Sequence, residues 1–267
     1  MMSVTTNTDW DEPLPAFLHD EWSAWVDSLS QLENFCVPRS YNSSFVDSTR
    51  REVLVFCDAS KDIIAAVEYL KLQDNDMCST NFLLGKAKVA PVHGHTIPRL
   101  ELCVAVLATE VAEFVRDQLS ILLQDFRFFS DSHIVLGYIS NESHRFYVYV
   151  GNRVARIHLF SHPSQWRFVQ SKLNPADVAT RPVNPSTLQD SSWIREPHSS
   201  LSTPTEDFQL VDPEHDTEIR PDVTCSKTDT TDVTHSNQNL QLVRQKCFLK
   251  DSLDFLVEIC LYVQLLA

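Results

Sequence analysis

The 267-residue chain is predicted to hold an α/β domain with a mixed five-stranded sheet, three antiparallel strands then two parallel ones, flanked by helices. Residues 53–57 form a continuous apolar run rich in β-branched side chains, which is typical of a strand buried on both faces. Residues 63–72 and 81–90 follow after short polar turns, as the strands of an antiparallel meander do. A helical stretch at 97–119 separates them from the next apolar run, 126–130, which can therefore return parallel to the first strand.

A helical extension is expected in front of this domain, over residues 1–50. Its apolar side chains recur at alternating spacings of four and three residues, which places them on one helical face: Leu18, Trp22, Trp25, Leu29 and Leu32. This face must pack either on the domain or on a separate partner, and the sequence leaves both open. The domain itself is expected over residues 51–195.

The helix expected at 97–119 carries the most informative side chain. Thr96 is a suitable N-cap, and Pro98 fits the first turn. Residues 100–108 are apolar apart from Glu101, and the other positions on its helical face are small: Ala105, Ala108 and Ala112. A buried carboxylate needs a cation, a metal ion or a proton. Either an arginine partner or a metal site would satisfy Glu101. Because a metal site needs further carboxylates at the same place, their presence or absence distinguishes the two.

The rest of the domain is predicted to continue with helices at 133–140 and 146–160 and a short fifth strand at 166–169. Asn174 and Pro175 then fit the N-cap and the first position of another helix. These elements fill the interval between the fourth strand and the end of the domain.

Three further acids stand beside strand or helix ends. Asp58 follows the first strand, Asp131 follows the fourth, and Asp177 lies in the first turn after Asn174. Together with Glu101 they are expected at the carboxyl edge of the first and fourth strands. Four carboxylates repel one another unless divalent cations neutralise them, and all-oxygen ligands favour Mg²⁺ or Mn²⁺ over zinc. Two such ions about 4 Å apart suit phosphodiester hydrolysis.

The order of these motifs resembles the ribonuclease H domain of retroelement polyproteins: D-A-S at 58–60, R-L-E-L at 99–102, S-D-S at 130–132 and N-P-A-D-V-A-T-R at 174–181. Three longer stretches are similar to the region behind the reverse transcriptase of Bel/Pao long-terminal-repeat retrotransposons: L-G-K-A-K-V-A-P at 84–91, H-T-I-P-R-L-E-L at 95–102 and R-F-Y-V-Y-V-G-N-R-V at 145–154. The resemblance covers roughly residues 10–222.

This resemblance implies a nuclease that cuts the RNA strand of RNA–DNA hybrids. It implies two Mg²⁺ or Mn²⁺ ions held by four acids: Asp58, Glu101, Asp131 and Asp177. Substrate contacts are expected from polar side chains near these acids: Ser60, Thr96, Arg99, Ser132 and Asn174. The expected partners are the hybrid and the reverse transcriptase domain of the same or another polyprotein.

The chain also departs from the family pattern. Ile97 and Pro98 replace residues that touch the hybrid in many ribonucleases H, and Ile134 stands where an aromatic is common. Arg167 and Phe168 occupy the place of a histidine thought to assist catalysis or product release. The metal site is therefore expected to be whole, while the surface that reads the substrate is altered.

Three alternatives stay open. An inactive remnant would keep only a folded or nucleic-acid-binding role. An aspartic peptidase, a label that this region of Pao elements sometimes carries, needs a glycine after its D-[ST] pairs, but Asp58 and Asp131 have none. A zinc site at His93, His95 and Cys103 is disfavoured because the cysteine lies in an apolar helical run.

The charge and the cysteine content limit which classes of protein remain. Residues 51–195 hold 15 basic and 15 acidic side chains, so the net charge of −14 belongs to the flanks. Residues 196–246 read as a disordered acidic Ser/Thr-rich linker and 247–267 as a short amphipathic helix. Seven cysteines without a C-x-x-C pair favour reduced thiols and an intracellular, non-secreted protein. The apolar C-terminal run is too short for a membrane span.

Overall fold

The computed structural model describes residues 15–36, 50–74, 77–91, 96–142, 145–181, 183–195 and 216–220. It contains one five-stranded sheet in the order β3-β2-β1-β4-β5. The strands are β1 (Arg50–Ala59), β2 (Ile63–Asp74), β3 (Met77–Val89), β4 (Phe126–Ser130) and β5 (Trp166–Phe168). β1, β2 and β3 pair antiparallel, whereas β4 pairs parallel with β1 and β5 parallel with β4. The predicted mixed α/β sheet is confirmed.

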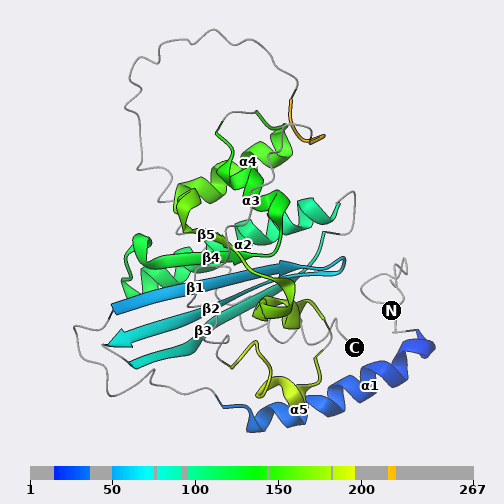
Figure 1. The fold of residues 1–267 in the computed structure, drawn as a ribbon. Helices are drawn as coiled ribbons and strands as arrows, with labels where there is room; N and C mark the ends of the chain where they lie inside the picture. The colour runs from blue at the N-terminus through cyan, green and yellow to red at the C-terminus, as the bar shows by residue number, and fades with distance from the viewer. Residues whose placement is uncertain are drawn as a thin grey trace.

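Helix α2 (Ile97–Leu119) is the crossover that brings β4 back beside β1. With α3 (His133–Ser140) and α4 (Val148–Phe160) it lies on one side of the sheet (Figure 1). The other side carries short elements: η5 (Ser171–Leu173), η6 (Pro175–Thr180) and α5 (Pro185–Leu188). Two more 3-10 turns precede β4 and β5: η3 (Leu123–Asp125) and η4 (Pro163–Gln165).

Some elements differ from the sequence expectation. The third strand, predicted over residues 81–90, is β3 and begins at Met77. The helix predicted from residue 146 begins at Val148, because Phe146 is used in an antiparallel bridge to Ile219. The helix predicted after Asn174 is the 3-10 helix η6, which Asn174 caps by accepting a hydrogen bond from the Ala176 N–H at 3.1 Å.

Both faces of β1 are covered, which explains its continuous apolar run. Val53, Val55 and Cys57 belong to the core against α2, and Leu54 and Phe56 to the smaller core on the η6 face. The three alanines on the Glu101 face of α2 are completely buried, so small side chains let this helix lie close to the sheet: Ala105, Ala108 and Ala112.

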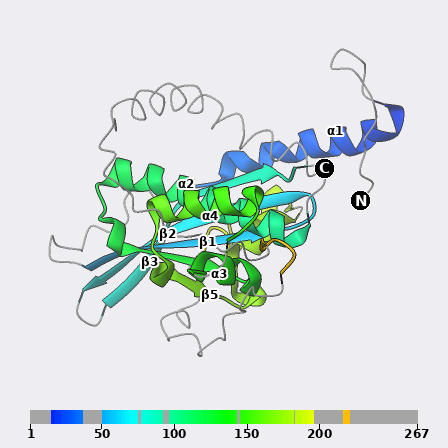
Figure 2. The ribbon, with the colours of Figure 1, turned by 90° about the horizontal axis from the view of Figure 1, so that it is seen from above.

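The N-terminal extension consists of η1 (Ala16–Leu18), α1 (His19–Ser28) and η2 (Leu29–Asn34). On the predicted apolar stripe Trp25 is buried, whereas Trp22 is 40% exposed. The Cys36 N–H donates to Gln189 Oε1 at 3.0 Å, and Gln189 Nε2 donates to the Cys36 carbonyl at 3.1 Å. These bonds join the extension to the residues just after α5, while α1 reaches past the sheet (Figure 2).

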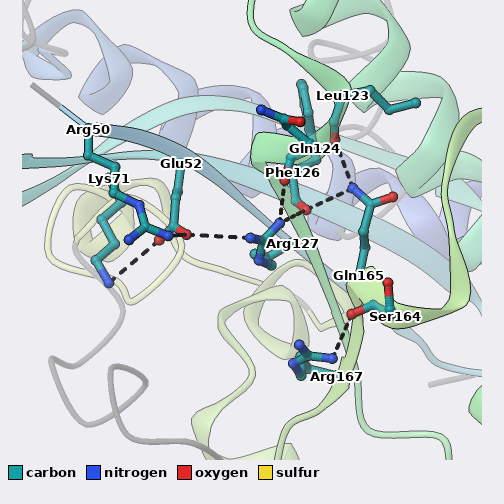
Figure 3. A network of polar contacts seen from close by, with 10 residues as sticks. All are labelled: Arg50, Glu52, Lys71, Leu123, Gln124, Phe126, Arg127, Ser164, Gln165 and Arg167. Carbon is teal, nitrogen blue, oxygen red and sulfur yellow. Dashed lines mark hydrogen bonds and ion pairs between the residues drawn. The ribbon is translucent and has the colours of Figure 1, made fainter.

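A polar network ties the strands together at the end of the sheet remote from Asp58 (Figure 3). Glu52 on β1 lies 3.1 Å from Arg50, 3.9 Å from Lys71 and 3.7 Å from Arg127. Arg127 and Gln165 donate in turn to backbone carbonyls of residues 123–126, which fixes the entry into β4. The charged residues of β1, β2 and β4 here support the sheet.

The C-terminal part of the chain is described only at residues 216–220, so the helix predicted at 247–267 lies outside the described residues. Within the linker predicted as disordered, residues 216–220 are structured through the bridge between Ile219 and Phe146. No helix in the described ranges is long and apolar enough to cross a membrane.

Gly85 on β3 makes room for the Trp193 indole. A Cβ at position 85 would lie inside contact distance of that ring, and the Tyr69 hydroxyl fixes the segment by donating to the Ser192 and Trp193 carbonyls at 3.0 and 2.9 Å. We expect Gly85→Ala to displace Trp193 and lower the free energy of unfolding by about 1–3 kcal/mol, measured by chemical denaturation followed by tryptophan fluorescence.

Gly151→Ala is the matched control, because a Cβ there meets only ordinary contacts at 3.8 Å or more, in a helix that favours alanine. An equal loss of stability in both variants would mean that the indole contact is not the reason for glycine at position 85.

Candidate metal centre

Three of the four predicted acids converge. Asp58, Glu101 and Asp131 each offer a carboxylate oxygen, and these three oxygens lie within 4.8 Å of one another. Asp58 lies at the C-terminal end of β1, and Asp131 follows β4, its parallel neighbour, so both reach the same sheet edge. Glu101 comes from the first turns of α2, whose alanine face brings it against the sheet.

Burial and the charges of neighbouring acids favour the protonated forms of Asp58 and Glu101. Desolvation raises the pKa of Asp58 to about 6, and the charges of Asp131 and Asp177 add to this effect. Desolvation and the charges of Asp131 and Asp58 raise the pKa of Glu101 to about 9. The Ala59 backbone N–H opposes both shifts by hydrogen bonding. A cation at this edge would relieve the repulsion.

The unpaired oxygens of the cluster fit a divalent ion. Oε2 of Glu101 and Oδ1 of Asp131 are buried, and no donor among the described residues reaches either atom. Uncompensated burial of such oxygens is costly, and an all-oxygen donor set suits Mg²⁺ or Mn²⁺. Burial raises the pKa of the adjacent Cys57 thiol, which donates weakly to the Phe129 carbonyl at 3.5 Å and is not a thiolate ligand.

Asp177 lies apart from the other three acids. It is on η6, and its Oδ1 accepts a hydrogen bond from Arg181 at 2.7 Å. Its charge still contributes to raising the pKa of Asp58, so it is near the cluster but outside the group of mutually close ligand atoms.

Two residues that the sequence reasoning missed hold the acids in place. The Thr180 hydroxyl donates to Asp58 Oδ2 at 2.8 Å, and the Ser171 hydroxyl donates to Asp131 Oδ2 through a short contact. Thr180 could have been found from the sequence, since it lies in the same N-P-A-D-V-A-T-R motif as Asp177. Ser171 could not have been found in this way, because the turn that carries it shows no distinctive sequence pattern.

Three of the predicted substrate-binding residues have structural roles. Ser60 closes the turn between β1 and β2 by accepting the Ile63 N–H at 3.0 Å, and Ser132 caps α3. Asn174 is buried and donates to the Cys57 carbonyl at 2.9 Å, which ties η6 to β1.

The other two predicted substrate-binding residues lie at the start of α2. Thr96 is the N-cap residue, but its side chain makes no capping hydrogen bond. Arg99 donates to Glu218 at 2.6 Å. Its guanidinium also lies over the ring of Tyr149.

The residues behind the zinc alternative and behind the departures from the family pattern lie partly within the described structure. His93 and His95 lie outside the described residues, and the Cys103 thiol lies 3.1 Å from the Tyr149 hydroxyl. Arg167 donates to the Ser164 carbonyl at 2.7 Å, and Phe168 stacks on His133 with ring centroids 4.0 Å apart. Arg167 and Phe168 therefore both have local structural contacts.

Thr180 provides a test of how the cluster is tuned. In Thr180→Val the loss of the donated hydrogen bond should raise the pKa of Asp58 above about 6, so protons compete better with metal. We expect Mn²⁺ affinity to fall about tenfold at pH 6.5 and less at pH 8, measured by titration calorimetry.

Thr187→Val removes the hydroxyl of an exposed threonine on α5, which donates to the carbonyl of the N-cap residue Asn184, and serves as the control. A loss of affinity that is the same at both pH values would contradict tuning through Asp58.

Comparison with known proteins agrees with this architecture. The order of the strands in the sheet and the three acids at its carboxyl edge define a ribonuclease H-like α/β domain. The family described as Pao retrotransposon-like RNaseH-like domain matches residues 2–132, a range that includes Asp58, Glu101 and Asp131. This match over residues 2–132 confirms the resemblance to Bel/Pao retrotransposons.

A solved structure is also similar to part of this chain. RNase H1 from the halophilic archaeon Halobacterium salinarum NRC-1 has a similar solved structure, with 14% identity, 48% of this chain and 92% of that chain covered, and a TM-score of 0.33. No curated protein matched the chain.

Proposed function

We propose that this chain is a metal-dependent endonuclease that hydrolyses the RNA strand of RNA–DNA hybrids. The observation that carries the proposal is the cluster of Asp58, Glu101 and Asp131, with buried unpaired oxygens at the carboxyl edge of a sheet in an RNaseH-like family. Structural acids in a core are normally paired, so unpaired oxygens in one group favour a ligand role.

The three clustered acids would hold Mg²⁺ or Mn²⁺, with Asp177 as a fourth acid at the edge of the group. Two ions would supply charge stabilisation to the attacking and leaving oxygens of the phosphodiester. Thr180 and Ser171 orient Asp58 and Asp131 by hydrogen bonding. Burial and the charges of Asp131 and Asp58 raise the pKa of Glu101 to about 9, so a cation bound at Glu101 would have to compete with a proton.

The proposed substrate is a hybrid duplex, recognised by shape and 2′-hydroxyls rather than by sequence. Thr96 and Arg99, at the start of α2, are the predicted contacts proposed for this role; Thr96 makes no capping hydrogen bond, and Arg99 is paired with Glu218. A reverse transcriptase domain of the same or another polyprotein is the proposed protein partner. The four cysteines in the described ranges are free thiols, which fits a reducing compartment.

A cleavage assay with the full chain tests this function. With Mg²⁺ we expect cuts in the RNA strand of an end-labelled hybrid, none in the DNA strand or in duplex DNA, and none with EDTA. Absence of cleavage by folded protein in both Mg²⁺ and Mn²⁺ would overturn the proposal in favour of a binding domain without activity. Peptide cleavage blocked by pepstatin would overturn it in favour of a peptidase.

A further inference from the structure

Residues 216–220, which we call the C-terminal strap, lie against the helical side of the domain. The Tyr147 N–H donates to the Glu218 carbonyl and the Arg220 N–H donates to the Arg145 carbonyl, both at 2.8 Å. These bonds flank the bridge between Ile219 and Phe146. Such a short ladder is marginal on its own, so side-chain contacts must contribute to holding the strap in place.

The side-chain contacts of the strap come from Arg220, whose guanidinium carbon lies 5.7 Å from the centroid of the Tyr147 ring, and from its two acids. Glu218 accepts from Arg99 Nε at 2.6 Å, and Asp216 Oδ2 accepts from the Tyr138 hydroxyl at 2.7 Å. The other oxygen of Asp216 accepts the Glu218 N–H at 2.8 Å, which fixes the two acids relative to each other. The strap thus presents two anionic groups to donors from α2 and α3.

The surface beneath the strap is basic and aromatic. The guanidinium carbons of Arg99 and Arg153 lie 4.7 and 3.6 Å from the centroid of the same ring, that of Tyr149. Arginines held on an aromatic ring are pre-oriented to donate to carboxylate or phosphate oxygens, which offer similar acceptors. Glu218 therefore occupies a position that suits a phosphate of a nucleic acid backbone.

We propose that Arg99, Tyr138, Tyr149 and Arg153 form a phosphate-binding patch for the nucleic acid, and that the acidic strap competes with the nucleic acid for it. The proposal rests on the proposed nuclease function, because it names a backbone contact of that substrate and the means of its control. Displacing the strap exposes the patch; docking the strap lowers the affinity for the hybrid.

The position of the patch fits a substrate that also reaches the acidic cluster. Arg99 precedes Glu101 by two residues, so the two side chains leave nearly opposite faces at the same end of α2. A helix with its side chains is about 10–12 Å across, and a nucleic acid strand covers that distance in about three nucleotides. A duplex that contacts both sites would have to span this distance around the start of α2.

Glu218→Gln in the full chain, alone and with Asp216→Asn, tests the proposal. Hybrid affinity is measured by fluorescence anisotropy in EDTA, so that cleavage does not interfere. We expect the dissociation constant to fall roughly three- to tenfold, and the slope of log K against log salt to steepen by about one unit, because Arg99 gains one phosphate. A further Arg99→Gln change in the same variant should remove the gain.

Glu113→Gln is the matched control. Glu113 pairs with Arg156 at 2.8 Å, and the side-chain exposures of this pair, 32% and 14%, match the 31% and 13% of Arg99 and Glu218. It should leave affinity and salt slope unchanged. An equal gain in hybrid affinity in this control would reveal a general charge effect and overturn the strap proposal.

The outcome also separates the two proposals. If the parent chain cleaves hybrids but Glu218→Gln binds them no more tightly, only the strap proposal fails. If no form cleaves hybrids yet the strap variants bind more tightly, the nuclease proposal fails and the patch stands. If the strap variants bind no hybrid, the patch is refuted.

Discussion

Asp131→Asn should abolish metal-dependent cleavage of the hybrid while leaving the protein folded. The variant keeps the side-chain size but replaces one of the three clustered carboxyl groups by an amide. We expect the rate to fall by at least about 10³-fold, equal to roughly 4 kcal/mol of lost transition-state stabilisation. Asp58→Asn should act in the same way. Rates are compared in single-turnover assays at saturating protein.

The folded state of Asp131→Asn should be as stable as the parent without metal, or slightly more stable, because one of three mutually repelling carboxylates is removed. Asp125→Asn is the control, since Asp125 precedes the same strand at its other end and is outside the cluster. Full activity in Asp131→Asn, or loss of activity only through unfolding, would count against the metal assignment.

Glu68→Met should raise the free energy of unfolding by about 2–3 kcal/mol at neutral pH. Glu68 lies on β2 opposite Val55 of β1 and Leu84 of β3 and is completely buried. Neither of its carboxylate oxygens has a hydrogen-bond donor within the described part of the chain. Methionine has a similar volume and no polar group to desolvate, so it removes the penalty without leaving a large cavity.

The gain should grow with pH. Burial raises the pKa of Glu68 well above its ordinary value of 4.5, so the folded state binds a proton more tightly than the unfolded chain does. The contribution of Glu68 to the stability of the parent is therefore most favourable below about pH 4.5 and becomes less favourable as pH rises, by up to about 1.4 kcal/mol per unit. Glu68→Met lacks this dependence, whereas Asp58 and Glu101 contribute equally to both proteins.

Urea denaturation in EDTA at pH 5 and pH 8 measures both effects. The matched control is Glu110→Met, which changes an exposed acid on α2 and should shift stability by less than about 0.5 kcal/mol. A Glu68→Met protein that is less stable than the parent, or a gain that shrinks with pH, would show that Glu68 is satisfied in the folded state.

The sheet and three acids were predictable because local patterns encode them. The apolar run at 53–57 required a strand covered on both faces, and a single acid on an alanine-lined helix face required a charged partner inside the fold. Strand ends in a parallel pair fall at one edge, so Asp58 and Asp131 had to lie near each other. The positions of these acids followed from topology rather than from side-chain detail.

Features that depend on long-range contacts were not predictable. Ser171 and Thr180 contact acids that are 40 and 122 positions away in the sequence, and hydroxyl residues are too common to signal this. The strap lies in a stretch whose composition indicated disorder, and its contacts with Phe146, Arg99 and Tyr138 join residues far apart in the sequence. Glu68 broke the apolar pattern of a strand without any sign that it would remain unpaired.

Anomalous diffraction from crystals of the full chain soaked in Mn²⁺ is the sharpest test of whether the three acids form a metal centre. We predict manganese density between the carboxylates of Asp58, Glu101 and Asp131, and its loss in Asp131→Asn crystals. Ordered carboxylates with no manganese between them, or with the strongest peak at another place in the molecule, would contradict the metal centre and the nuclease function that depends on it.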